Sequence, residues 1–250
     1  MKFVIPSYQR PYIFRDYTLK FLSKHGVSVN DIYVFIREDD PYQDYYLKSC
    51  NIIKCNVKGI GKTHNFITEY FDEGEFIVEI DDDLEELYDN ERKPITDFLS
   101  CVNNMKTIMT EKNISYGGTY QVNNPMFMSQ CNHYTNDLRY MLGCVRFRFI
   151  RKDIILETNF SEDFEGCILH YIRDNAILKN NWICPKTKNY NNTGGCNGAG
   201  RNIETEKADK EFLANKYPEY CSLFERKNGH WDLRLKHKKK YKLVAETVGE

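Results

Sequence analysis

Short apolar runs alternate with stretches of helical periodicity over the first ninety residues of the chain. Runs rich in β-branched and aromatic residues predict strands at residues 3–5, 32–36, 51–53 and 76–80. Apolar positions at helical spacing predict helices at residues 17–24 and 62–71. Strands that alternate with short helices are typical of βαβ units. The pattern therefore predicts an α/β fold with a mostly parallel central sheet flanked by helices.

Polar residues gather where each of these predicted strands ends. They are Ser7 and Tyr8, Glu38 and Asp39, Gly59 and Gly61, and Asp81 to Asp83. In open α/β sheets, ligands bind beyond the carboxyl ends of the strands. We therefore expect the binding site at this edge of the sheet.

The pattern changes after the fourth predicted strand. It predicts helices at residues 95–111, 167–179 and 205–217, and strands at residues 116–119, 144–150 and 182–184. The chain contains no internal repeat and no clear linker. We therefore expect a single domain over residues 1–250, made of a first half at 1–90, a second part at 91–200 and a C-terminal helix with a basic tail at 201–250.

The charges nearly cancel, since 35 Lys and Arg face 36 Asp and Glu and leave a net charge of −1. This balance excludes a globally basic nucleic-acid-binding protein but not a local basic patch. No apolar run reaches the roughly 18 residues that a membrane helix needs, and no signal-peptide pattern is present. The nine cysteines form no C-x-x-C pair, which favours a reducing compartment. We expect a cytoplasmic protein without a membrane span, of unknown oligomeric state.

The three carboxylates that follow the strand at 76–80 are the sharpest chemical signal. Carboxylates held together at the end of a buried strand repel one another and need a cation or hydrogen bonds. Asp81 and Asp83 are suited to a hard divalent ion, which would neutralise a diphosphate. The alternative is a solvated turn in which an aspartate caps a helix that begins near Leu84.

Two other strand ends carry groups that suit a nucleotide. Residues 58–63 resemble a phosphate-binding P-loop, but Asn56 stands where that motif requires glycine, so we exclude it. What remains is a helix start whose amides and Lys62 face a phosphate. After the first strand, Tyr8 offers a ring for stacking on a base and Arg10 a guanidinium for a phosphate. An ordinary loop is the alternative for this segment.

The order of these motifs resembles the nucleotide-sugar-binding half of a GT-A fold glycosyltransferase. The resemblance rests on residues 4–8, on Gly59 with residues 63–65, and on residues 76–83. It extends more loosely to Glu162 and Asp163, which look like the family's acidic motif. His64 departs from the arginine that is usual in the family. The resemblance implies a GT-A-like fold, with residues 1–90 as the nucleotide-sugar-binding half and 91–200 as the acceptor half.

The resemblance also implies an activity and a set of site residues. The activity is metal-dependent transfer of a hexose from a nucleotide diphosphate sugar, a UDP-sugar above all, to an acceptor hydroxyl. Asp163 would be the base that inverts the anomeric centre, beside Glu162. The metal, Mn²⁺ or Mg²⁺, would be held by Asp81, Asp83 and His230. The donor would contact Pro6, Ser7, Tyr8, Arg10, Asp39, Gly61, Lys62, Asn65, Asp81, Asp82, Gly195 and Arg201.

The C-terminal third resembles a narrower group, the glycosyltransferase-like proteins of phages and large viruses. Some of these are proposed to add sugars to hydroxymethylated pyrimidines in DNA. The resemblance rests on residues 193–201, 216–218 and 228–234. Gly194 and Gly195 would permit close approach of the backbone to a ligand. It implies DNA as the preferred acceptor, with the base flipped into the pocket.

Basic residues supply a route to DNA binding. The run at 236–242 is suited to a phosphate backbone, although a solvated tail is an equal alternative. Arg146, Arg148, Arg151 and Lys152 form a second basic element.

Three other functions stay open. The first is transfer to a protein or glycan. The second is a nucleotidyltransferase, whose glycine- and basic-rich signature residues 6–8 do not match. The third is a non-catalytic nucleic-acid-binding module with a degenerate transferase fold.

Overall fold

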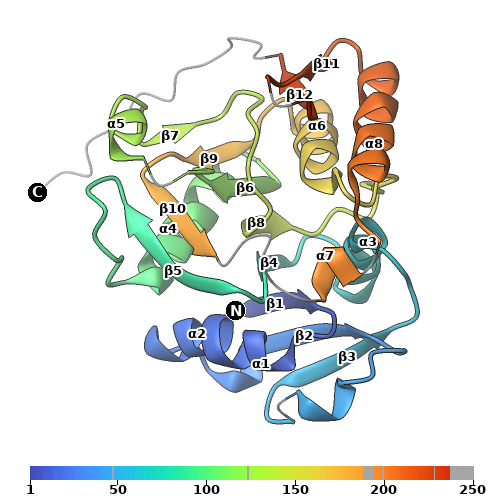
Figure 1. Ribbon diagram of the computed structural model, residues 1–250. Coiled ribbons are helices and arrows are strands. Elements are labelled where there is room, and N and C mark those ends of the chain that lie inside the picture. The colour runs from blue at the N-terminus through green and yellow to red at the C-terminus, as the bar shows by residue number, and fades with distance from the viewer. Residues whose placement is uncertain (47, 123, 188–193, 199, 228, 237–250) are drawn as a thin grey trace, which may run out of the picture.

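The computed structural model describes residues 1–46, 48–122, 124–187, 194–198, 200–227 and 229–236 (Figure 1). Its strands are β1 (Lys2–Ser7), β2 (Ile32–Arg37), β3 (Asn51–Cys55), β4 (Phe76–Ile80), β5 (Leu84–Asp89), β6 (Tyr116–Thr119), β7 (Tyr134–Thr135), β8 (Val145–Phe149), β9 (Leu178–Asn180), β10 (Ile183–Thr187), β11 (Cys221–Glu225) and β12 (Trp231–Leu235).

The α-helices are α1 (Pro11–Phe14), α2 (Lys20–Lys24), α3 (Ile60–Tyr70), α4 (Phe98–Glu111), α5 (Pro125–Met128), α6 (Glu162–Asp174), α7 (Gly195–Gly198) and α8 (Ile203–Lys216). A π-helix, Arg15–Leu19, joins α1 to α2, and short 3-10 helices span Val29–Asp31 and Gln43–Tyr45. No described helix has the length and apolar character needed to cross a bilayer.

The central sheet has the strand order β3-β2-β1-β4-β8-β6-β9-β7. The pairs β3–β2, β2–β1, β1–β4 and β6–β9 are parallel, whereas β4–β8, β8–β6 and β9–β7 are antiparallel. Two further antiparallel pairs, β5–β10 and β11–β12, lie outside this sheet. Because β1, β2 and β4 run in the same direction, the polar residues that follow them meet at one edge.

Alternating side chains of the strands build a core on each face of the sheet. Phe3 and Ile5 of β1 pack with Phe98 of α4, and the rings of Phe3 and Phe98 lie 5.9 Å apart. Val4 points to the opposite face and packs with Ile67 of α3. A third cluster joins α6, α8 and the β11–β12 hairpin, which lie next to one another in Figure 1. Helices thus cover both faces of the central sheet, as the sequence predicted.

The structure corrects two of the predicted elements. The helix expected at residues 167–179 begins earlier, at Glu162, and ends at Asp174, because Asn175 adopts a left-handed conformation with φ of 55°. Residues 178–180 are strand β9 instead. Leu84 begins strand β5, so Asp83 does not cap a helix.

Candidate functional site

One cavity of about 240 Å³ opens at the ends of β1 and β4 and at the N-terminus of α6. Its walls include most of the residues predicted from the sequence: Pro6, Ser7, Tyr8, Arg10, Asp81, Asp82, Asp83, Glu162, Asp163, Gly195 and Arg201. Segments from the start, middle and end of the described chain therefore meet here. The topology places the acidic residues after β4 and those of α6 around the same space.

The end of β1 is tied to Asp82 by a short hydrogen-bond network. Ser7 Oγ donates to Asp82 Oδ2 at 2.6 Å, and Arg10 Nη1 lies 3.2 Å from Asp82 Oδ1. The hydroxyl of Tyr46 lies 2.9 Å from Ser7 Oγ and accepts from the backbone N–H of Arg10 at 3.2 Å. Burial raises the pKa of Asp82 to about 6, against the opposing effects of Arg10 and Ser7. Asp82 thus anchors the β1 end.

Asp81 and Asp83 both line the cavity, where a divalent cation would need them. Burial and then the neighbouring carboxylate of Asp83 raise the pKa of Asp81 to about 8. A hard cation between the two groups would relieve this repulsion, and carboxylate oxygens are the ligands that Mn²⁺ and Mg²⁺ prefer. The two aspartates therefore fit a metal. Among the described residues, however, no group of three or more His, Cys, Asp or Glu side chains is arranged to hold one.

The ring of Tyr8 forms part of the cavity wall next to a cation. The guanidinium carbon of Arg37, which also lines the cavity, lies 4.1 Å from the ring centroid. Asp39 accepts a hydrogen bond from Arg37 Nη2 at 2.5 Å. Asp39 itself is not part of the wall, and in this structure its carboxylate orients Arg37.

Glu162 and Asp163 form an acid pair in the first turn of α6. Burial and then the charge of Asp163 raise the pKa of Glu162 to about 7, although Arg146 Nη2 lies 3.1 Å from Glu162 Oε1. Burial also raises the pKa of Asp163, but its carboxylate accepts hydrogen bonds from the Tyr140 hydroxyl and the Phe164 N–H. Donors on both oxygens favour the ionised form, so Asp163 loses its proton before Glu162 does.

A buried ionic network lies behind this pair. Glu79 contacts His64 Nδ1 and is 2.5 Å from Arg148 Nη1 and 3.5 Å from Arg146 Nη1. Burial would raise the pKa of Glu79, but these neighbours hold it well below its usual value. Burial lowers the pKa of His64 to about 4, so the ring is neutral and its Nε2 accepts from Arg146 Nη1 at 2.6 Å.

This network corrects the interpretation of the Arg-x-Arg pattern in β8. Arg146 and Arg148 are each 5% exposed and pair with Glu79, which lies opposite Arg146 in the sheet. They are therefore core cations and not a nucleic-acid-binding surface. Arg151 pairs with Glu73 near the surface. His64, where the resemblance to GT-A glycosyltransferases led us to expect arginine, is part of the same buried network.

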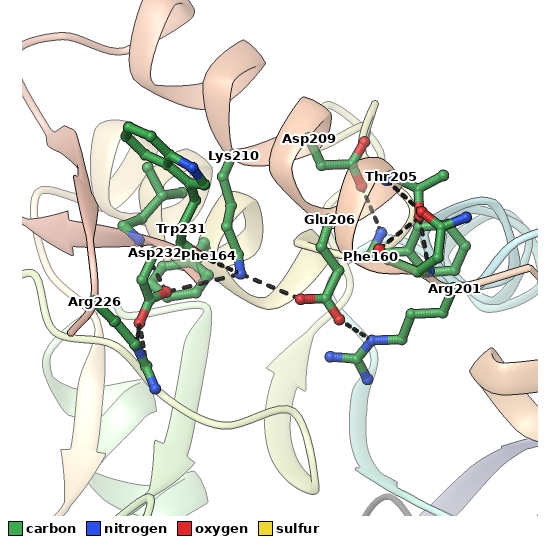
Figure 2. A network of polar contacts seen from close by, with 12 residues as sticks. Phe160, Phe164, Arg201, Thr205, Glu206, Asp209, Lys210, Arg226, Trp231 and Asp232 are labelled. Atoms are coloured by element: carbon green, nitrogen blue, oxygen red, sulfur yellow. Dashed lines mark hydrogen bonds and ion pairs between the residues drawn. The ribbon is translucent and has the colours of Figure 1, made fainter. Parts of the chain in front are cut away.

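The C-terminal part supplies Gly195, Cys196 and Arg201 to the wall. The Gly195 N–H donates to the Tyr8 carbonyl at 2.8 Å, and a Cβ on Gly195 would lie 2.4 Å from the guanidinium carbon of Arg10. The close approach expected of these glycines is thus to the β1 loop of the same chain. Figure 2 shows Arg201 held by Glu206 of α8, which also contacts Lys210.

The structure places several predicted residues outside the cavity wall. Lys62 is exposed on α3, and His230 is exposed just before β12. Asn65 is engaged by the backbone of Leu156, to which it donates at 2.8 Å and from which it accepts at 2.9 Å. Gly61 faces the Thr158 carbonyl, since a Cβ there would lie 1.9 Å from that oxygen.

Sequence reasoning missed Arg37, Tyr140, Arg146 and Cys196, which all line the cavity. Arg37 directly follows the predicted strand at 32–36, so its place at the binding edge of the sheet could have been predicted. Glu79 inside an apolar strand was a signal for a buried cation such as Arg146. Tyr140 lies in a segment without a regular pattern and gave no signal. Thr193 and residues 237–242 of the basic run lie outside the described residues.

No protein-family model matches the chain, and no curated protein matches it in sequence. Among solved structures, it is similar to glucosyl-3-phosphoglycerate synthase from Mycobacterium tuberculosis, with 10% identity and a TM-score of 0.52 over 94% of this chain and 86% of that chain. Another solved structure, of a mycobacterial protein, gives 9% identity and a TM-score of 0.52 over 94% of this chain and 82% of that chain. The likeness to the synthase shows the fold alone and confirms the GT-A-like class.

The chain is also similar to a fragment, residues 1–349, of TarS from S. aureus. The identity is 16% and the TM-score 0.44, over 74% of this chain. This chain spans 60% of the length of that fragment.

Proposed function

We propose that this protein is a glycosyltransferase that moves a hexose from a nucleotide diphosphate sugar to an acceptor hydroxyl. The observation that carries the proposal is the cavity itself, in which two carboxylate sets with different surroundings line one space. Asp81 and Asp83 follow β4, and Glu162 and Asp163 begin α6. Metal-assisted glycosyl transfer with inversion uses both a cation site for the leaving diphosphate and a base for the acceptor.

The donor nucleotide would lie against the β1 side of the cavity. Tyr8 offers an aromatic ring backed by Arg37, which suits a planar base. Arg10 and Arg201 line the same cavity and suit phosphate oxygens. The solved synthase with the same fold holds Mn²⁺, UDP and phosphoglyceric acid. This supports a UDP-sugar as the first donor to test.

A divalent ion, Mn²⁺ or Mg²⁺, would be held by Asp81 and Asp83. Such an ion supplies positive charge that stabilises the departing diphosphate. Two observations support this assignment: both aspartates line the cavity, and the charge of Asp83 contributes to the raised pKa of Asp81. Asp82 stays with Ser7 and Arg10 and keeps the β1 loop in place.

Asp163 would act as the base. Its carboxylate takes the proton of the acceptor hydroxyl, the acceptor oxygen bonds to the anomeric carbon, and the bond from that carbon to the diphosphate breaks. One displacement of this kind inverts the anomeric centre. The hydroxyl of Tyr140 and the N–H of Phe164 orient the carboxylate, and Arg201 favours its ionised form. Glu162, with its pKa of about 7, stays protonated up to a higher pH than Asp163, which limits the repulsion between the two carboxylates.

The acceptor is the least constrained part of the proposal. A hydroxymethylpyrimidine in DNA is the first acceptor to test, and its support is the basic run at residues 236–242 of the sequence. A protein or glycan hydroxyl is the second. The inward position of Arg146 and Arg148 removes one of the two basic elements that favoured DNA.

The experiment is a thermal-shift panel of sugar nucleotides with Mn²⁺, followed by mass spectrometry of DNA, peptide and glycan acceptors. Stabilisation by one donor, and a mass increase of one hexose in one acceptor, would support the proposal. A protein that binds DNA but no sugar nucleotide would instead be a nucleic-acid-binding module. The proposal fails if no donor protects the protein and none is consumed.

A further inference from the structure

Five consecutive backbone N–H groups, at residues 156–160, all donate to side-chain oxygens of only three residues. We call this segment the strap. Asn65 Oδ1 accepts from the first N–H, at 2.9 Å, and Glu165 Oε2 from the second and third, at 2.9 and 2.8 Å. Asp209 Oδ2 accepts from the last two, those of Asn159 and Phe160, at 3.0 and 2.7 Å. The backbone donors of this irregular segment are thereby satisfied by side chains instead of by a strand or helix partner.

The strap leads directly into the acid pair. Phe160 lines the cavity, Ser161 is the N-cap of α6, and Glu162 and Asp163 follow. On its other side the strap lies against the start of α3, where the Thr158 carbonyl occupies the space left by Gly61. The position of Asp163 therefore depends on where the strap is held.

Three residues accept hydrogen bonds from the strap. Asn65 lies on α3 and Glu165 on α6, whereas Asp209 lies on α8. One turn before it on the same helix, Glu206 holds Arg201, which also lines the cavity. Figure 2 shows Glu206 and Asp209 extending from α8 toward Arg201 and Phe160. Lys210, which contacts Glu206, also bonds the Trp231 carbonyl at 3.0 Å and ties α8 to the hairpin.

We infer that Asp209 is a positioning residue, which places Asp163 for proton removal by holding Asn159 and Phe160. The inference rests on the proposed function of Asp163. Asp209 is not among the residues that line the cavity, and its Oδ2 accepts from two N–H groups of the strap, so it acts on Asp163 only through the strap. Its removal would release the last residues before α6, and displacements of about 1 Å can cost on the order of 100-fold in rate.

Two variants separate hydrogen bonding from charge. Asp209→Ala removes the acceptor oxygen, whereas Asp209→Asn keeps one acceptor oxygen and loses the charge. Glu211→Ala on the same helix is the matched control, since Glu211 is half-exposed and pairs at the surface with Lys207 at 3.5 Å. Each variant is assayed for kcat, for the KM of the donor, for melting temperature and for amide exchange in the strap.

We expect Asp209→Ala to lower kcat by about 10-fold or more, to leave the donor KM within about twofold and to speed exchange of the Asn159 and Phe160 amides. Asp209→Asn should keep most of the activity, and Glu211→Ala all of it. Wild-type kcat in Asp209→Ala would overturn the inference, as would an equal loss in Asp209→Asn. A wild-type protein that consumes no sugar nucleotide would instead overturn the proposed function, whatever Asp209 does to the strap.

Discussion

Arg146 Nη2 lies 3.1 Å from Glu162 Oε1, so a cation of the buried sheet directly touches the acid pair of the cavity. Through its other nitrogen, Nη1, Arg146 reaches His64 and Glu79. The central sheet therefore sets the electrostatic environment of the residues proposed to act on the acceptor. A change at this contact affects both the stability of the fold and the acidity of Glu162.

Replacement of Arg146 by Met should destabilise the protein strongly. Glu79 and Glu162 would lose a cation inside the protein, and breaking a buried pair costs about 3–5 kcal/mol. Urea unfolding measures this loss. Arg151→Met is the control, because Arg151 pairs with the half-exposed Glu73 and surface pairs contribute at most about 1 kcal/mol. Equal losses in the two variants would contradict the buried network.

The free energy of unfolding should depend on pH through the titration of Glu162. Its pKa rises from 4.5 in the unfolded chain to about 7 in the folded protein. Because the folded state prefers the protonated form, this stabilisation is complete below pH 4.5 and is lost as the pH rises through 7. A shift of this size corresponds to ~3 kcal/mol.

Glu162→Gln removes this titration and is the matched comparison. The variant should therefore gain stability relative to the wild type as the pH rises from about 4.5 to 8. Chemical unfolding at a series of pH values measures the difference. Parallel curves for the two proteins, or a difference of opposite sign, would show that Glu162 is not held protonated.

Asp163→Asn should remove most of the transfer activity without unfolding the protein. A general base contributes about 10²- to 10⁴-fold to the rate, so kcat should fall by that order while the donor KM changes little. Initial rates over a range of donor concentrations give both values. Asp153→Asn serves as the control, because Asp153 pairs with Arg173 at the surface. A variant at position 163 with full kcat would assign the base to another residue.

The first half of the fold was predictable because its signals are local. Each short apolar run became a strand of the sheet, and the polar clusters after β1 and β4 met as the parallel topology requires. The family resemblance also pointed to Asp163, and the structure brings this residue to the same cavity.

What could not be predicted depends on contacts between distant segments. Gly61 and Asn65 were expected at a phosphate, but they accommodate and hold the strap, which lies about 90 residues later. Arg146 and Arg148 looked like surface cations because their partner Glu79 is on another strand. The end of α6 was missed because Asn175 takes a left-handed turn that periodicity does not reveal.

The most direct test of the central claim is release of nucleoside diphosphate from a panel of sugar nucleotides, with and without Mn²⁺, by the wild type and by Asp83→Ala. We expect release from at least one donor, only with the metal, and its loss in the variant, because Asp81 and Asp83 line the cavity and are proposed to hold the cation together. No release from any donor, or equal release in the variant and in the absence of metal, would contradict it.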